Sequence, residues 1–257
     1  MSLGKKIVFF DIDDTLLDRK KKLPTTTIDS IKQLQQKGIK TVIATARPPF
    51  LFETLRKELN IESYISFNGQ YVVHDGEVIY DNPLNHEQLH AIYESSSAYD
   101  FPMGFVSESE MCATRDNHPY VKQSILLETY PRVDQTFHKT ENVYQALLYC
   151  KVGKESSIKE SHPEFYFQRW HPLSCDIIPK GASKAVGVQK ILERENVRLE
   201  QSYAFGDGIN DLEMFAEVGN SIAMGNAIEE LKLAASYVTE DVENDGIMKG
   251  LQHYRLI

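Results

Sequence analysis

The first third of the chain alternates between short apolar runs and amphipathic segments, and this alternation limits the folds that the chain can adopt. The segment 25–38 places Ile28, Ile31 and Leu34 at helical spacing. Its threonines can cap the start of a helix, and Gly38 can end it. Strands are expected at 5–10, 39–45 and 63–69, and helices at 25–38 and 48–60. This order is typical of a parallel sheet covered by helices.

A segment of different character interrupts the alternation. A hairpin is expected first, because Asp75-Gly76 suits a tight primed turn between two apolar runs. The following segment mixes helices with short strands, after which the strand–helix alternation returns. We therefore expect an α/β protein with a Rossmann-like parallel-sheet core, formed by residues 1–82 and 180–257, and an inserted α/β domain at 83–179.

Composition excludes several classes of partner. The net charge is −9 and there is no long basic block beyond Lys20–Lys22, so a surface for nucleic acid or anionic lipid is not expected. Three cysteines without a C-x-x-C pair argue against a disulfide framework and a structural zinc cluster. The sequence also lacks the apolar run of a signal peptide and the ~20 apolar residues of a membrane span. We expect a soluble, cytoplasmic protein with no membrane partner.

Several predicted strands end in residues that carry chemistry. In an open parallel sheet, ligands bind beyond the carboxyl ends of the strands. Four segments contribute side chains there: Asp11 and Asp13 after the first strand, Thr45 and Arg47 after the second, Asn68 after the third, and Asp207 and Asp211 after a strand at 202–206. Carboxylates, a hydroxyl and an amide are thus expected at one edge of the sheet.

The acidic residues at this edge predict a metal site. Converging carboxylates such as Asp11, Asp13 and Asp207 repel one another and raise each other's pKa unless a cation lies between them. No histidine or cysteine belongs to the group. Oxygen coordination of Mg²⁺, completed by water and a substrate phosphate, therefore fits better than zinc.

Four motifs make the pattern specific: DIDDTLL (11–17), ATAR (44–47), GASKA (181–185) and GDGINDLEMF (206–215). In this order, with a large insertion between the second and the third, they resemble the motifs of the haloacid dehalogenase (HAD) superfamily. The pattern is similar in particular to the Cof-type phosphatases with a type C2B cap. The resemblance covers the whole core and weakens in the insertion, which it identifies as a cap that sets substrate specificity.

The resemblance implies a role for each matching residue. Asp11 would be the nucleophile that forms an aspartyl-phosphate, and Asp13 the acid that protonates the leaving oxygen and later activates water. Mg²⁺ would be held by Asp11, the backbone carbonyl of Asp13 and Asp207, with Asn210 and Asp211 supporting the ion and Lys184. The phosphate-binding residues would be Thr45, Lys184, Asn210 and Asn68, of which Thr45 and Lys184 would also stabilise developing charge.

These roles predict a Mg²⁺-dependent phosphatase that hydrolyses a small phosphorylated metabolite, either a sugar phosphate or a phosphorylated cofactor. A phosphomutase of the same superfamily is an alternative, since it resembles this architecture but protects its phospho-enzyme from water. A non-catalytic phospho-acceptor protein is a second alternative. Such a protein would need neither a second acid like Asp13 nor a cap.

Three positions depart from the pattern of the superfamily. Asp14, Ala46 and Ala185 stand where glycine is usual. If position 14 requires a positive φ, aspartate is among the residues that tolerate it best. Asp14 also adds charge beside the nucleophile, and the sequence leaves open whether its side chain points into the site.

Other motifs allow competing interpretations. The segment HEQLH (86–90) matches the H-E-x-x-H pattern of zinc proteases, but an amphipathic helix that buries Leu89 and Ile92 is the simpler interpretation. Arg47 is interpreted as structural, pairing with a carboxylate. Weak candidates for contact with the leaving group are Arg115, His118, Arg169, Trp170 and His171 of the insertion.

Overall fold

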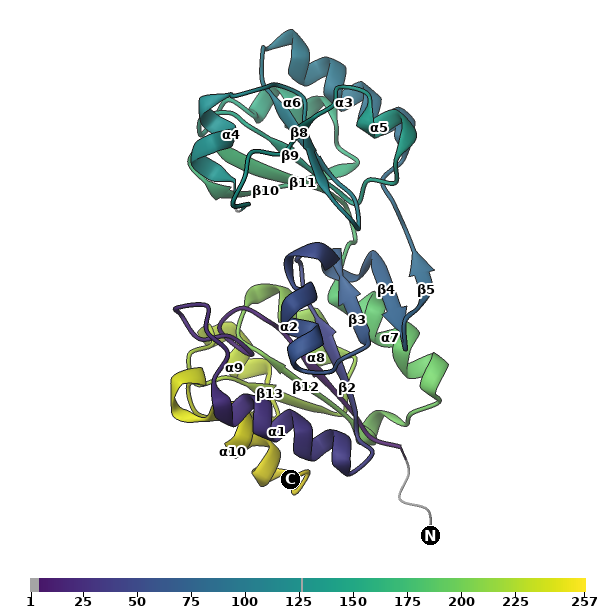
Figure 1. Cartoon of the computed structure of the whole chain (residues 1–257), viewed down its shortest axis with the longest axis vertical. Helices are drawn as coiled ribbons and strands as arrows, with labels where there is room; N and C mark the ends of the chain where they lie inside the picture. The colour runs from purple at the N-terminus through teal and green to yellow at the C-terminus, as the bar shows by residue number, and fades with distance from the viewer. Residues whose placement is uncertain (1–4, 126) are drawn as a thin grey trace. The chain divides into compact units, whose positions relative to one another are not determined.

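The computed structural model describes residues 5–125 and 127–257, which form two compact units (Figure 1). The core unit comprises the described residues up to Arg47 together with Leu51–Asp81 and Ser183–Ile257. The inserted unit comprises Pro48–Phe50 and Asn82–Ala182. That the first unit is catalytic and the second sets substrate specificity stays a prediction at this point.

An eight-stranded sheet forms the centre of the core unit. Its strands lie in the order β14-β13-β12-β1-β2-β3-β4-β5, parallel from β14 to β3 and antiparallel at β4 and β5. The strands are β1 (Ile7–Phe10), β2 (Lys40–Ala44), β3 (Ser63–Ser66), β4 (Tyr71–His74), β5 (Glu77–Asp81), β12 (Ser202–Gly206), β13 (Asn220–Ala223) and β14 (Tyr237–Val238).

Helices cover both faces of this sheet. Alternate residues of β1 point to opposite sides, so that Val8 and Phe10 join one apolar cluster and Ile7 and Phe9 the other. The cluster that contains Val8 and Phe10 includes residues of α1 (Thr25–Gln36) and α10 (Gly246–His253), and Leu55 of α2 (Glu53–Glu58) packs against it. The cluster that contains Ile7 and Phe9 includes residues of α7 (Lys184–Glu195), α8 (Leu212–Ala216) and α9 (Glu229–Ala234). Each fully buried aliphatic side chain of these clusters contributes about 1.5–3 kcal/mol. The expected Rossmann-like α/β core is confirmed.

The inserted unit contains a six-stranded sheet in the order β10-β11-β9-β6-β7-β8. All its neighbouring strands are antiparallel except β7 and β8. The strands are β6 (Met103–Val106), β7 (Met111–Ala113), β8 (Arg132–Val133), β9 (Gln145–Leu148), β10 (Phe165–His171) and β11 (Ser174–Pro179). The helices are α3 (His86–Ala98), α4 (Pro119–Ser124), α5 (Phe137–Thr140) and α6 (Ser156–Ser161). A third apolar cluster joins α3, α5 and α6 to the sheet.

Local features confirm some expectations and correct others. Asp75 and Gly76 both have positive φ, as the predicted primed turn between β4 and β5 requires. The predicted threonine cap is wrong, because Pro24 is the N-cap of α1 and no side chain caps it. The third strand ends at Ser66 rather than at residue 69, because Phe67 and Asn68 adopt left-handed backbone conformations that a strand cannot contain.

The helix expected at 48–60 is also shorter than predicted. A 3₁₀ turn at Pro49–Leu51 precedes α2, which spans only Glu53–Glu58. Phe52, between the 3₁₀ turn and α2, has φ −131° and ψ 16°, outside the helical region, so the α-helix begins only after it. Within residues 5–125 and 127–257, no helix has both the length and the apolar character that crossing a bilayer requires.

Candidate active site

The site lies at the carboxyl edge of the parallel strands of the core unit. Asp11 directly follows β1, and its backbone N–H donates to the carbonyl of Phe205 in β12, which extends the ladder between the two strands. Asp207 follows β12. Because β1 and β12 are paired and parallel, both aspartates leave the sheet at the same edge.

Lys184 connects two of the carboxylates at this edge. It is the first residue of α7 and its side chain is fully buried. The Nζ atom lies 2.5 Å from Oδ1 of Asp11 and 2.6 Å from Oδ1 of Asp211. Burial alone would lower the pKa of Lys184, but the charges of Asp11 and Asp211 outweigh it and raise that pKa. The ammonium group therefore stays charged between two carboxylates.

Asp211 is held from two directions. Its Oδ1 accepts from Lys184, and its Oδ2 accepts from the backbone N–H groups of Asp207 and Gly208, both at 3.0 Å. A Cβ at position 206 would lie 2.5–2.8 Å from the side-chain atoms of Asp211, so this close approach depends on Gly206. Asp211 thus joins the loop after β12 to the start of α7.

Asp11, Asp207 and Asp211 each offer a carboxylate oxygen within 4.8 Å of the others. Burial raises the pKa of Asp11 to about 7. The positive charge of Lys184 lowers this pKa, but repulsion from Asp211 and Asp207 raises it further. Burial also raises the pKa of Asp207 to about 6, although its Oδ1 accepts a hydrogen bond of 2.8 Å from Thr15. The protein does not balance all of the negative charge of these three aspartates. Because each of them offers an oxygen as the ligand atom, the group fits a hard divalent cation such as Mg²⁺.

The Asp13 carboxylate is paired with cations and does not join this group. Arg47 donates from Nε to Oδ2 at 2.9 Å and from Nη2 to Oδ1 at 2.6 Å, and Lys21 donates to Oδ1 at 2.8 Å. Burial would raise the pKa of Asp13, but these hydrogen bonds and charges lower it. The expected pairing of Arg47 with a carboxylate is confirmed. The motif resemblance implies that Asp13 binds the metal ion through its backbone carbonyl, and this group does not take part in the contacts with Arg47 and Lys21.

The remaining phosphate-binding candidates come from three loops of the core unit. Thr45 is buried after β2, and its Oγ1 accepts from the N–H of Arg47 at 3.1 Å. Asn68 donates its N–H to the carbonyl of Thr45, and its Oδ1 accepts from Nδ2 of Asn210 at 3.2 Å. The loop that carries Asn68 contacts the start of α7 so closely that a Cβ on Gly69 would lie 1.9 Å from a backbone oxygen. The structure thus links Thr45, Asn68 and Asn210.

The zinc-protease interpretation of HEQLH is not supported. Nδ1 of His86 lies 2.8 Å from the carbonyl oxygen of His138, and Nδ1 of His90 lies 3.2 Å from Nε2 of the same residue. Within the described part of the chain, no third metal-ligand group joins His86 and His90. Leu89 and Ile92 are buried as expected, so this segment is an amphipathic helix that covers the sheet of the inserted unit.

All five weak candidates in the inserted unit have local partners. Arg115 pairs with Asp100, and Arg169 pairs with Glu155 and donates to backbone carbonyls. His118 caps α4 by accepting from the N–H of Tyr120. Trp170 donates to Asp176 at 2.7 Å, and Nδ1 of His171 accepts from the N–H of Leu173.

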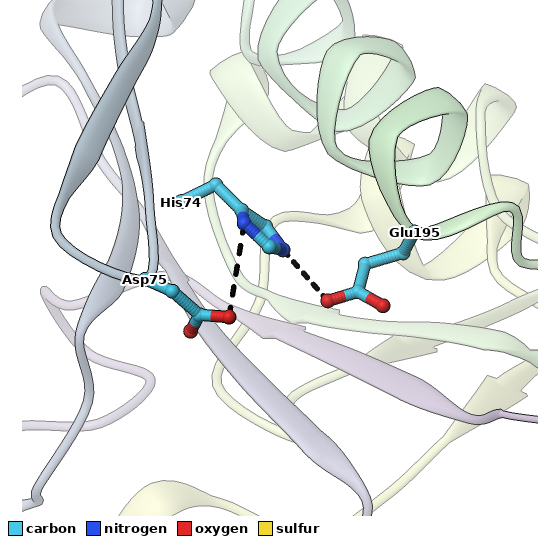
Figure 2. A group of neighbouring side chains, drawn as sticks. All are labelled: His74, Asp75 and Glu195. Carbon is cyan, nitrogen blue, oxygen red and sulfur yellow. Dashed lines mark hydrogen bonds and ion pairs between the residues drawn. The ribbon is translucent and has the colours of Figure 1, made fainter.

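A second cluster of ionisable groups lies in the core unit, and no sequence motif indicates it. Figure 2 shows the imidazole of His74 between Asp75 and Glu195, with Nε2 2.6 Å from Oε1 of Glu195 and Nδ1 3.7 Å from Oδ2 of Asp75. Lys40 pairs with Asp75 and Lys5 with Glu195, so cations already balance both carboxylates. The cluster borders a cavity of about 450 Å³ beside the start of β2. We interpret it as an ion-pair network that joins the β4–β5 turn to the end of α7.

Comparison with known proteins gives consistent results. The model for the haloacid dehalogenase-like hydrolase family matches residues 8–251. "Putative phosphatase YkrA" of Bacillus subtilis (strain 168) is 40% identical over 257 residues, which cover 99% of this chain and 100% of the relative. The 5-amino-6-(5-phospho-D-ribitylamino)uracil phosphatase YitU of the same organism is 28% identical over 263 residues, with 96% and 97% covered.

Solved structures agree with the sequence matches. A crystal structure of a hypothetical protein from Geobacillus kaustophilus superposes with a TM-score of 0.96 and 44% identity, covering 99% of this chain and 100% of the other. The HAD subclass IIB sugar phosphatase BT4131 superposes with a TM-score of 0.81 and 31% identity, covering 98% and 100%.

Proposed function

Because the chain belongs to the haloacid dehalogenase-like hydrolases, as a phosphatase of the Cof type, we propose that it hydrolyses small phosphomonoesters with Mg²⁺ through an aspartyl-phosphate on Asp11. The observation that carries this proposal is the buried Lys184 ammonium between Asp11 and Asp211, with Asp207 beside them at the carboxyl edge of the sheet. This arrangement provides a nucleophile, a fixed positive charge and the oxygen donors for a metal ion.

In the first step, an oxygen of Asp11 attacks the phosphorus atom of the ester, and the bond from phosphorus to the alcohol oxygen breaks. The departing oxygen takes a proton from Asp13, which leaves an acyl phosphate on Asp11. In the second step, Asp13 takes a proton from a water molecule that attacks the phosphorus, and the Asp11 carboxylate and inorganic phosphate are released. Before the first step, Asp13 must take up a proton from solvent and release the contacts of its Oδ1 with Lys21 and with Nη2 of Arg47, while its Oδ2 stays bound to Nε of Arg47.

Other residues of the site hold the reacting groups in place. Lys184 fixes the Asp11 carboxylate and offers a positive charge to the phosphoryl oxygens, while the buried hydroxyl of Thr45 can donate to them. When bound by Asp11, Asp207 and the backbone carbonyl of Asp13, Mg²⁺ supplies a charge clamp that balances the negative charge of the transferred phosphoryl group. Asp211 supports this arrangement by fixing Lys184 and the N–H groups of Asp207 and Gly208.

The relatives suggest which leaving groups to test. One is named for a phosphorylated ribitylaminouracil and one structural neighbour is named a sugar phosphatase. We propose that the substrate of this chain is likewise a small phosphorylated metabolite, either a sugar phosphate or a phosphorylated cofactor.

The test is phosphate release from a panel of such esters, with Mg²⁺ or with EDTA, by the intact protein and by Asp11→Asn. We expect release that requires Mg²⁺ and that the variant loses. Asp75→Asn is a matched control, because it makes the same change in the cluster beside the start of β2. Interconversion of phosphate isomers without release would identify a mutase instead. An intact protein that is inert on every ester, or an active Asp11→Asn variant, would contradict the proposal.

A further inference from the structure

Asp14 has a backbone conformation that favours glycine. Its φ is 58°, in the left-handed region, and glycine is usual at this position of the motif. The backbone is held there by Asn226, whose Nδ2 donates to the Asp14 carbonyl at 2.7 Å. Asn226 is itself fixed, because its Oδ1 accepts from the N–H of Val242 at 2.9 Å. The chain therefore keeps a carboxylate where the backbone would accept a residue without a side chain.

One oxygen of the Asp14 side chain, Oδ1, is buried and has no hydrogen-bond partner among the residues that the structure describes. Lys21 lies near enough for the charge of Asp14 to raise its pKa, but its ammonium group donates to Asp13. A buried carboxylate oxygen without a partner is unfavourable, so this arrangement calls for a cation or an ordered water.

Asp14 is also near the carboxylates of the metal site. The next residue, Thr15, donates to Oδ1 of Asp207 at 2.8 Å, which places the loop that carries Asp14 beside this carboxylate. It does not belong to the group of three aspartates whose oxygens lie within 4.8 Å of one another. Its position therefore suits an outer carboxylate that acts through water, and Mg²⁺ characteristically retains several waters in proteins.

Asp14 adds to an excess of negative charge at the site. Among the described residues, Lys184 is the cation that contacts the group formed by Asp11, Asp207 and Asp211. The contacts of Lys21 and Arg47 go to Asp13 instead. The three carboxylates therefore attract a divalent cation, and the charge of Asp14 increases this attraction.

We propose that Asp14 is an outer carboxylate of the Mg²⁺ site, which strengthens binding of the ion through its charge and through an intervening water. This inference rests on the proposed function, because it assumes that Asp11 and Asp207 bind the ion. Asp14 would thus have a role in metal binding at a position where the motif of the superfamily usually has glycine. A water held by Asp14 beside Asp207 would also satisfy the buried Oδ1.

The test measures Mg²⁺ binding without substrate, by isothermal titration calorimetry of the metal-free full chain. We expect Asp14→Asn and Asp14→Gly to raise the Kd for Mg²⁺ about 3- to 10-fold, and to raise the melting temperature measured in EDTA, because repulsion of Asp207 is removed. Asparagine and glycine both accept the positive φ, so both variants should fold. Asp29→Asn, on the exposed face of α1, makes the same charge change away from the site.

A Kd that stays within twofold of the intact protein in both Asp14 variants would overturn the inference, as would an equal effect of Asp29→Asn. Asp207→Asn separates this failure from failure of the proposed function. If Asp207→Asn abolishes Mg²⁺ binding while the Asp14 variants do not change it, only the role of Asp14 is wrong. If the intact protein does not bind Mg²⁺, or if Asp207→Asn binds it unchanged, the metal site itself is wrong and both proposals fail.

Discussion

Arg47 contacts both carboxylate oxygens of Asp13, with Nε 2.9 Å from Oδ2 and Nη2 2.6 Å from Oδ1. The two residues are 34 positions apart and follow neighbouring strands of the parallel sheet. Two-point contact fixes the orientation of a carboxylate as well as its charge. The proposed acid and base of the reaction is therefore held in one orientation before substrate binds.

Loss of this contact should impair turnover more than substrate binding. We expect Arg47→Gln to lower kcat about 10-fold with a smaller change in KM, because Asp13 would be held by Lys21 alone. A double-mutant cycle checks the reason. In an Asp13→Asn background the Arg47 substitution should have almost no further effect on kcat. A full 10-fold loss in that background would show that Arg47 acts independently of Asp13.

Replacement of Lys184 should affect both stability and activity. In Lys184→Met two carboxylates lose their shared cation inside the protein, and removing one partner of a buried ion pair costs about 3–5 kcal/mol. We expect the free energy of unfolding in urea to fall by about this amount and phosphate release to fall at least ~10³-fold. In Lys184→Met combined with Asp11→Asn, part of the stability should return, because one unpaired charge has been removed. Equal stability of the two variants would contradict this explanation.

Much of the site was predictable because its parts depend on short-range sequence patterns. The apolar runs of β1, β2 and β12 specify parallel strands, and a parallel sheet brings the residues after them to one edge. The placement of Asp11, Thr45 and Asp207 follows from that rule alone. Lys184 required the resemblance, because a lysine at the first turn of a helix has no distinctive pattern.

The parts that were not predictable depend on side-chain conformations and on contacts between distant residues. The pairing of Asp13 with Lys21 joins two residues eight positions apart in the chain, and no sequence pattern indicates it. His74 and Glu195 are 121 positions apart and neither belongs to a motif. The hydrogen bond between Asn68 and Asn210 likewise joins two loops whose relative position only the folded sheet defines.

The loop that carries Asn68 should tolerate no side chain at position 69. In Gly69→Ala, the new Cβ would overlap the backbone oxygen of Ser183, and φ is +90°. We expect a loss of unfolding free energy well above the ~1 kcal/mol of a simple left-handed glycine replacement, together with loss of activity, because the contact with the start of α7 would open. Gly76→Ala is the matched control, since its φ is +81° and its Cβ would meet open space. Similar urea midpoints for the two variants would contradict the prediction.

Mg²⁺ should stabilise the protein increasingly as pH rises from 5.5 to 8. In the metal-free protein the pKa values of Asp207 and Asp11 are raised to about 6 and about 7, above the ordinary value of 3.8. The folded state then binds more protons than the unfolded state, so stability present at low pH is lost as pH rises through 6 and 7. A bound Mg²⁺ removes this loss, because the cation favours the ionised carboxylates.

The measurement is the melting temperature with Mg²⁺ minus that with EDTA, taken at each pH. We expect the difference to grow by several degrees between pH 5.5 and 8, as a stability change of about 1–3 kcal/mol implies for a chain of this size. Taking the difference removes the contributions of titrating groups away from the site. His138 is one such group: burial lowers its pKa to about 4, so its contribution to stability increases as pH rises. In Asp207→Asn the difference should become small and independent of pH. If the difference in melting temperature of the intact protein does not change with pH, protonation of Asp11 and Asp207 does not compete with Mg²⁺ binding. These two carboxylates would then not be ligands of the ion.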